Sequence, residues 1–126
     1  MIDDYFRWIL NLIERSSIVV SPDISFDRRD DQIGFIRGDS VFRDGSRLHF
    51  REYARQQEGK PVERYMYAYY YQRADGIMVF RMDDAEHYPH LKGFPHHRHS
   101  ENGEVISSSP PDLEKVLLEI ESLTSD

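Results

Sequence analysis

The chain has 126 residues and no cysteine, which excludes a disulfide framework and any zinc site with cysteine ligands. Its net charge of −7 argues mildly against nucleic acid as a partner, but the central residues 28–98 carry 13 Lys and Arg against 11 Asp and Glu. No apolar run approaches the roughly 20 residues that a membrane-spanning helix needs, and residues 1–4 are acidic where a signal peptide would be basic. We therefore predict one α+β domain over residues 1–126, located in the cytoplasm and with no membrane partner.

Helical periodicity marks both ends of the chain. In residues 6–13 apolar side chains recur at helical spacing, and Asp3 or Asp4 is a possible cap for the helix start. Residues 109–112, Ser-Pro-Pro-Asp, are typical of a second helix start, with a serine cap and proline in the first turn. One apolar stripe follows it: Leu113, Val116, Leu117, Ile120 and Leu123. We expect two helices whose apolar faces pack on the core.

The segment between these helices is predicted to be an antiparallel meander of about five strands. The expected strands cover residues 17–27, 32–43, 46–56, 62–73 and 77–84. Two Asp-Gly pairs, at residues 44–45 and 75–76, separate β-like runs. This dipeptide suits a two-residue hairpin turn, which needs positive φ at both positions. The predicted fold class is therefore α+β, with the meander flanked by an N-terminal and a C-terminal helix.

A two-residue turn at Asp75-Gly76 would determine which side chains meet across the last hairpin. It predicts that Ala74 faces Ile77, Tyr71 faces Phe80 and Tyr70 faces Arg81. The surface expected under the helices is apolar: Tyr67, Tyr69, Tyr71, Met78, Phe80 and Met82. The opposite surface is polar: Arg64, Ala68, Tyr70, Gln72, Arg81 and Asp83.

Five histidines lie between His87 and His99, in a segment that also contains Pro89 and Pro95 and is predicted to be an ordered loop. Imidazole titrates near neutral pH, so several together suit acid–base catalysis or a metal. For a metal, Asp83 or Glu86 could add a carboxylate, but the spacing matches no strong zinc signature. Two or three of the histidines could equally cap turns or bridge carboxylates.

A second polar pattern lies on the predicted strand 46–56. Arg47, His49 and Arg51 alternate there and so share one face of the sheet. Together with Arg37 and Arg43 on the preceding strand they could form a shallow basic track. A solvated sheet face is an equally open interpretation.

The histidine segment carries a family resemblance. Residues 75–89, DGIMVFRMDDAEHYP, followed by residues 94–99, FPHHRH, resemble the TumE family of bacterial and archaeal toxin-like proteins. Members of that family typically show FRYDNAPHHP and then FPHHKH, and the similarity spans about residues 30–122. The chain differs at Met82, Asp84 and Glu86, where the family has an aromatic residue, asparagine and histidine. The missing histidine bears on any mechanism that needs two adjacent ones there.

The resemblance implies the toxin of a two-gene toxin–antitoxin module, acting as a ribonuclease and bound by an antitoxin with a helix-turn-helix domain. The candidates carried over by position are Arg81, Asp83, His87, His96, His97 and His99.

Our first hypothesis is a metal-independent endoribonuclease with no cofactor. In it, His96 or His97 works with His99 as acid and base, and Asp83 orients an imidazole or a guanidinium. The side chains expected to bind phosphate or substrate are Arg81, Arg98, Arg51, Arg47 and Tyr70.

Three other functions remain open from the sequence. They are a toxin that binds RNA or the ribosome without cutting, a metal-dependent hydrolase or transferase, and a protein-binding module. A homodimer is also plausible, because exposed sheet edges need a cover.

Overall fold

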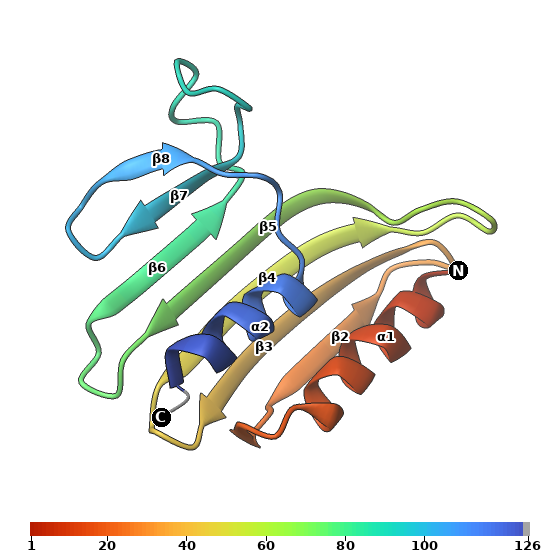
Figure 1. The fold of residues 1–126 in the computed structure, drawn as a ribbon. Coiled ribbons are helices and arrows are strands. Elements are labelled where there is room, and N and C mark those ends of the chain that lie inside the picture. Colours follow the sequence, from red (N-terminus) through yellow and green to blue (C-terminus); the bar gives the residue numbers. More distant parts are fainter. Residues whose placement is uncertain (125–126) are drawn as a thin grey trace.

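The computed structural model describes residues 1–124, in which two helices pack against an antiparallel sheet (Figure 1). Helix α1 covers Ile2–Arg15 and helix α2 covers Leu113–Thr124. The strands are β1 (Val19–Ser21), β2 (Ile24–Arg28), β3 (Ile33–Phe42), β4 (Arg47–Arg55), β5 (Glu63–Gln72), β6 (Met78–Asp83), β7 (His97–Ser100) and β8 (Val105–Ser107). The sheet order is β1-β3-β4-β5-β6-β7-β8, and β2 also pairs with β3. The predicted class and the two flanking helices are confirmed, but the sheet has eight strands instead of about five.

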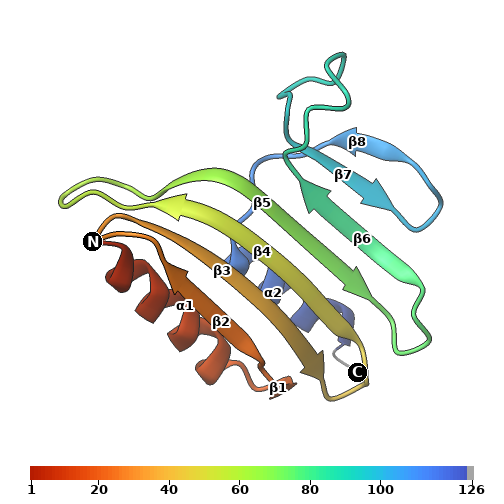
Figure 2. The same cartoon turned by 180° about the vertical axis from the view of Figure 1, so that it is seen from behind.

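The two faces of this sheet have different environments. Both helices lie against one face, which we call the helix face, and the opposite face is bare of helices within residues 1–124; we call it the open face (Figures 1 and 2). Side chains on the helix face form the core, and Ile36, Phe50 and Phe80 are fully buried there. No helix of the described chain is long and apolar enough to span a bilayer.

The helix starts differ from the predicted caps. Helix α1 begins at Ile2 with Met1 as the N-cap, and the Asp4 carboxylate accepts a hydrogen bond of 2.8 Å from the terminal amine of Met1. At α2 the capping oxygen belongs to Asp112, which accepts the Lys115 N–H at 2.9 Å, so the serine cap at Ser109 was wrong. The predicted stripe of α2 is buried except for Leu123, which is 54% exposed.

Three hairpins of the sheet share one turn geometry, which is not the predicted one. Among residues 1–124, Gly45, Gly76 and Gly103 have positive φ, whereas the Asp or Asn before each does not. Each loop has three residues. The backbone N–H of the residue before the loop donates to the carbonyl of the residue after the glycine, as the N–H of Arg73 does to the carbonyl of Ile77. This is a type I turn followed by a glycine bulge. The Asp and Asn oxygens instead accept the N–H two residues on, at 2.9–3.0 Å.

The register of the β5–β6 hairpin is nevertheless the predicted one further from the turn. Tyr71 faces Phe80 and Tyr70 faces Arg81, as expected. Ala74 lies inside the turn and so does not face Ile77, which corrects that pair. An irregularity next to Gln72 shifts the pairing by one residue and restores the predicted register.

Two segments of the sheet were predicted incorrectly. The expected strand 17–27 is divided into β1 and β2, because Pro22 cannot donate to a ladder and Asp23 has a φ of 32°. The hairpin β7–β8 was not predicted, and residues 97–99 were assigned to the histidine loop, since β7 reads His-Arg-His-Ser and has no apolar alternation. Its overlooked signal was the Asn102-Gly103 pair before Val105 and Ile106.

A buried carboxylate joins α1 to the sheet. Glu52 on β4 is fully buried on the helix face and accepts hydrogen bonds from the hydroxyls of Tyr5 on α1 and Tyr69 on β5. The guanidinium of Arg64 lies 3.9 Å from the same carboxylate, so Arg64 is on the helix face and its predicted position on the opposite, polar surface was wrong. The register shift between Tyr53 and Ala54 of β4 accounts for the difference. Burial raises the pKa of Tyr69, and the nearby Glu52 charge raises it further. Both tyrosines are therefore neutral donors that satisfy Glu52 within the core.

Candidate functional site

The pairing of β6 with β7 brings four of the predicted site residues together. Arg81 faces His99 and Asp83 faces His97 across the two strands. Paired residues of an antiparallel sheet share a face. All four therefore lie on the open face, where Arg81 also faces Tyr70 of β5. We call these four residues, with His87 and Tyr88 of the connecting loop, the His–Asp cluster.

The carboxylate of Asp83 is the centre of the cluster. It is 4% exposed, and one oxygen lies 2.9 Å from Nε2 of His97 while the other accepts Nε of Arg81 at 2.8 Å. It also accepts the backbone N–H of Ala85 at 3.0 Å. A carboxylate with this many donors is held in one orientation. Asp83 therefore positions the side chains around it.

His97 is buried behind the surface of the cluster. Its side chain is 1% exposed, and Nδ1 donates to the carbonyl of Pro95 at 2.9 Å, because a carbonyl can only accept. Nε2 is occupied by Asp83. Both ring nitrogens of His97 are therefore bonded inside the protein, and neither is free to contact a molecule outside it.

His99 is the imidazole of the strand pair that reaches solvent. Its side chain is 25% exposed, and Nε2 lies 3.9 Å from the nearest oxygen of Asp83. Burial lowers the pKa of His99 below its usual value, and the charges of His97, Arg81 and His87 lower it further against the opposing effect of Asp83. The ring is therefore neutral at pH 7 and can accept a proton. Arg81, 41% exposed, presents its guanidinium on the neighbouring strand.

The loop between β6 and β7 folds an aromatic ring onto the histidines. It projects beyond the ends of these strands (Figure 1). The ring of Tyr88 lies edge-on to His97 at 4.9 Å and to His99 at 5.8 Å, and His87 lies beside it at 6.4 Å. Tyr88 was not among the predicted site residues. The available signal was its position inside the proline-bounded histidine segment.

Two predicted site residues lie away from the cluster. His96 stacks on Tyr67, with ring planes 12° apart, and its Nδ1 is 2.8 Å from the Tyr67 hydroxyl. Arg98 is on the helix face, where it donates to both oxygens of Glu119 in α2, at 2.8 and 2.6 Å, and lies over the ring of Phe80. Neither side chain has a contact with the cluster, so we leave both out of the site proposed below.

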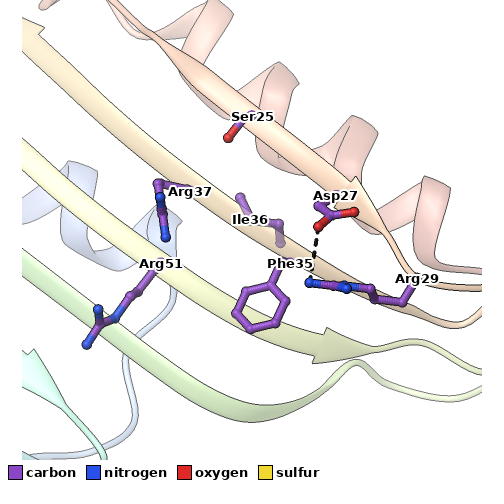
Figure 3. Close-up of a pocket in the computed structure, with 7 residues that line it drawn as sticks. All are labelled: Ser25, Asp27, Arg29, Phe35, Ile36, Arg37 and Arg51. Carbon is purple, nitrogen blue, oxygen red and sulfur yellow. Dashed lines mark ion pairs between the residues drawn. The ribbon is translucent and has the colours of Figure 1, made fainter.

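The remaining predicted residues line two hollows elsewhere on the open face. Arg47 and Tyr70 border a hollow of about 340 Å³, together with His49, whose Nδ1 lies 2.7 Å from Asp39. Arg51 borders another of about 290 Å³, shown in Figure 3. The residues of the predicted basic track are thus divided between two hollows, and Arg43 lies in the turn after β3 and borders neither of them.

Three groups of the cluster meet the distance condition for a metal site. Asp83, His97 and His99 each offer a ligand atom, and these atoms lie within 4.8 Å of one another. However, His97 and Asp83 are directed at each other and are bonded. A metal would have to replace that contact, so we assign no ligands here.

Comparison with known proteins identified a family. The family model described as Toxin TumE matches residues 9–124. No curated protein and no solved structure matches the chain.

Proposed function

The chain belongs to the TumE toxin family, and from this premise we propose that it acts by cleaving RNA at the His–Asp cluster without a metal ion. The toxin role follows from the family. The observation that carries the cleavage proposal is the pairing of His99 with Arg81 on the open face, above the buried Asp83 and His97.

The proposed reaction is an internal transesterification. His99, neutral at pH 7, takes the proton of a ribose 2′-hydroxyl, and that oxygen attacks the adjacent phosphorus. Arg81 offsets the charge that builds on the phosphoryl oxygens. The bond to the 5′-oxygen breaks, and His87 supplies the proton that this leaving oxygen needs. The products are a 2′,3′-cyclic phosphate and a 5′-hydroxyl end.

A toxin family implies an antitoxin as partner. As part of the proposal, the antitoxin carries a helix-turn-helix domain and covers the open face, and both proteins act in the cytoplasm. The outer strands of the sheet are short, with three residues each in β8 and β1 and five in β2, and short edges have less need of a second copy to protect them. A homodimer therefore stays a prediction without support from the sheet edges.

The proposal is tested by comparing two histidine variants from the same segment. His99→Ala removes the base, whereas His96→Ala removes an imidazole outside the cluster. Purified proteins are incubated with RNA in EDTA, and the new ends are mapped. The same variants are expressed in cells without antitoxin, with circular dichroism to verify folding.

We expect wild type and His96→Ala to arrest growth and to produce 5′-hydroxyl ends in EDTA, and His99→Ala to do neither. Equal activity of the two variants would contradict the assignment of His99. Cleavage that stops in EDTA would favour a metal-dependent hydrolase. Growth arrest with intact RNA would favour a toxin that binds RNA or the ribosome without cutting, which the open-face arginines would also serve.

A further inference from the structure

A second group of side chains on the open face lies across β2–β5, outside the His–Asp cluster. Arginines alternate there with aromatic rings, and we call the group the Arg–aromatic patch: Arg29, Phe35, Arg37, Arg51, Tyr53 and Tyr65. Part of it borders the hollow of about 290 Å³ (Figure 3).

Two arginines of the patch face each other without a counterion. Arg37 on β3 is the direct partner of Arg51 on β4, and both are exposed. Within residues 1–124, neither makes an ion pair or a side-chain hydrogen bond, and among the residues drawn in Figure 3 the marked ion pair joins Asp27 to Arg29. Like charges directly opposite on a sheet destabilise it. In a chain of net charge −7, this pair indicates a site for an external anion.

Aromatic rings continue the patch along the same strands. The rings of Phe35 and Tyr53 stack at 4.7 Å, and Tyr65 lies 5.4 Å from Tyr53. Tyr65 is 48% exposed, and the guanidinium of Arg29 lies over the Phe35 ring at 5.5 Å. Exposed aromatic rings beside guanidinium groups are the surface on which unpaired bases stack.

The strand register connects this patch to the His–Asp cluster. One row across the open face runs from Arg37 through Arg51, Ala68 and Asp83 to His97. Neighbouring strands are about 4.8 Å apart, so β4 and β6 are separated by roughly 10 Å. The intervening residue, Ala68, has a small side chain, and neighbouring groups leave it 8% exposed. A short stretch of extended single-stranded RNA can span this distance.

We infer that the Arg–aromatic patch binds single-stranded RNA, with a backbone phosphate between Arg37 and Arg51 and a base stacked at Tyr53. Paired guanidinium forks match phosphate oxygens, and the rings select unpaired bases over a duplex, whose bases are already stacked. The inference rests on the proposed ribonuclease function and names its substrate class. The patch holds the strand while the His–Asp cluster cuts it.

Binding is measured on full-length His99→Ala protein, so that the probe stays intact. The probe is a fluorescein-labelled oligouridine of about 12 nucleotides, a length within known single-strand site sizes. Into this background we introduce Arg37→Ala/Arg51→Ala, Tyr53→Leu or the control Arg7→Ala/Arg15→Ala. The control removes the same charge from exposed positions on α1. Anisotropy gives Kd at several salt concentrations, and thermal melts verify folding.

We expect Arg37→Ala/Arg51→Ala to weaken binding far more than the control. If each arginine neutralises one phosphate, the double variant should also reduce the magnitude of the slope of log K against log salt by about 1.4. Tyr53→Leu is expected to raise Kd at least about fivefold, the lower range for a base–aromatic stack. A duplex probe binds more weakly than the single strand. Equal losses in the two double variants, no loss in either, or preference for the duplex would overturn the inference.

A further arm uses oligoglutamate as competitor, because an acidic segment of an antitoxin is the other possible occupant. If the patch arginines are needed for oligoglutamate and not for RNA, the inference is overturned. If wild-type protein binds oligouridine through the patch but does not cleave RNA, the proposed function fails and this inference stands. If the patch variant, with His99 intact, binds and cuts RNA as wild type does, the inference fails and the proposed function stands.

Discussion

Three histidines within four residues have three different environments. His96 stacks on Tyr67 towards the helix face, His97 is buried between a carboxylate and a carbonyl, and His99 reaches solvent on the open face. Alternation along β7 directs the side chains of residues 97 and 99 to the same face of the sheet. Their exposure differs, because His97 is buried whereas His99 reaches solvent. Residue type alone therefore does not identify the base; the deciding quantities are exposure and the occupancy of each ring nitrogen.

The lowered pKa of His99 predicts a pH dependence. The groups facing its ring are His97, Asp83, Arg81, His87 and Tyr88. A base must be unprotonated, so kcat/KM for RNA should rise with pH through a value below 6.5, the usual pKa of histidine. NMR titration of the His99 imidazole, assigned with His99→Gln, should give the same midpoint. An activity limb centred above pH 6.5 would show that another group is the base.

The same shift has a consequence for stability. Below pH 6.5 the unfolded chain binds a proton at His99 more readily than the folded chain does. Protonation of His99 therefore favours the unfolded chain, and the free energy of unfolding should fall as the pH drops below 6.5. In the His99→Gln variant this decrease should be smaller.

At the scale of elements, the position of α1 on the sheet depends on both apolar and polar contacts. The ring of Phe6 lies so close to Gly34 of β3 that an added Cβ would meet it at 2.3 Å. The hydroxyl of Tyr5 satisfies the buried Glu52 from the same helix. The Phe6–Gly34 contact determines the distance between α1 and the sheet. The Tyr5–Glu52 hydrogen bond determines the position of α1 along the strands.

We predict that Tyr5→Phe destabilises the protein by about 1–3 kcal/mol, since it leaves the buried Glu52 carboxylate without one of its donors. The matched control is Tyr70→Phe, because within the described chain the Tyr70 hydroxyl has no hydrogen-bond partner; its free energy of unfolding should stay within about 0.5 kcal/mol of wild type. Urea unfolding measures both. Similar values for the two variants would mean that the Tyr5 hydroxyl contributes little to holding α1.

At the scale of the whole molecule, the core lies on one face of the sheet and the proposed site on the other. The helix face contains the core and the Arg98–Glu119 pair, which ties β7 to α2. The open face, which Figure 2 shows free of helices, contains the His–Asp cluster and the Arg–aromatic patch, and charged side chains line its hollows, one of which is drawn in Figure 3. An antitoxin that neutralises the toxin by contact should therefore cover the open face.

This predicts a protection pattern in hydrogen exchange. Adding the cognate antitoxin should slow amide exchange in residues 84–96 and in the edge strand β8, whose outer side pairs with no strand of the described chain. The exposed side of α1 should remain unchanged. Cleavage of RNA should be inhibited in parallel. Protection confined to the two helices would show instead that the antitoxin acts from the helix face.

Much of the fold followed from local patterns in the sequence. Apolar residues that recur about every 3.6 positions predicted both helices. Apolar residues at every second position predicted most of the strands up to β6 and the side of the β5–β6 hairpin that is buried. The hairpin β7–β8 was missed, because a strand reading His-Arg-His-Ser is stabilised by its neighbour and its buried contacts, not by its own propensity.

The family, the α+β class and the segment of the proposed site could be predicted from the sequence alone. Which of the candidate side chains meet depends on the tertiary structure, in which His97 pairs with Asp83 and Arg98 lies on the opposite face. The tertiary structure also stacks Phe35 on Tyr53, residues that are far apart in the chain. The physical reason is that periodicity is set by neighbouring residues, whereas register, burial and hydrogen-bond partners arise from strands that pair across long separations.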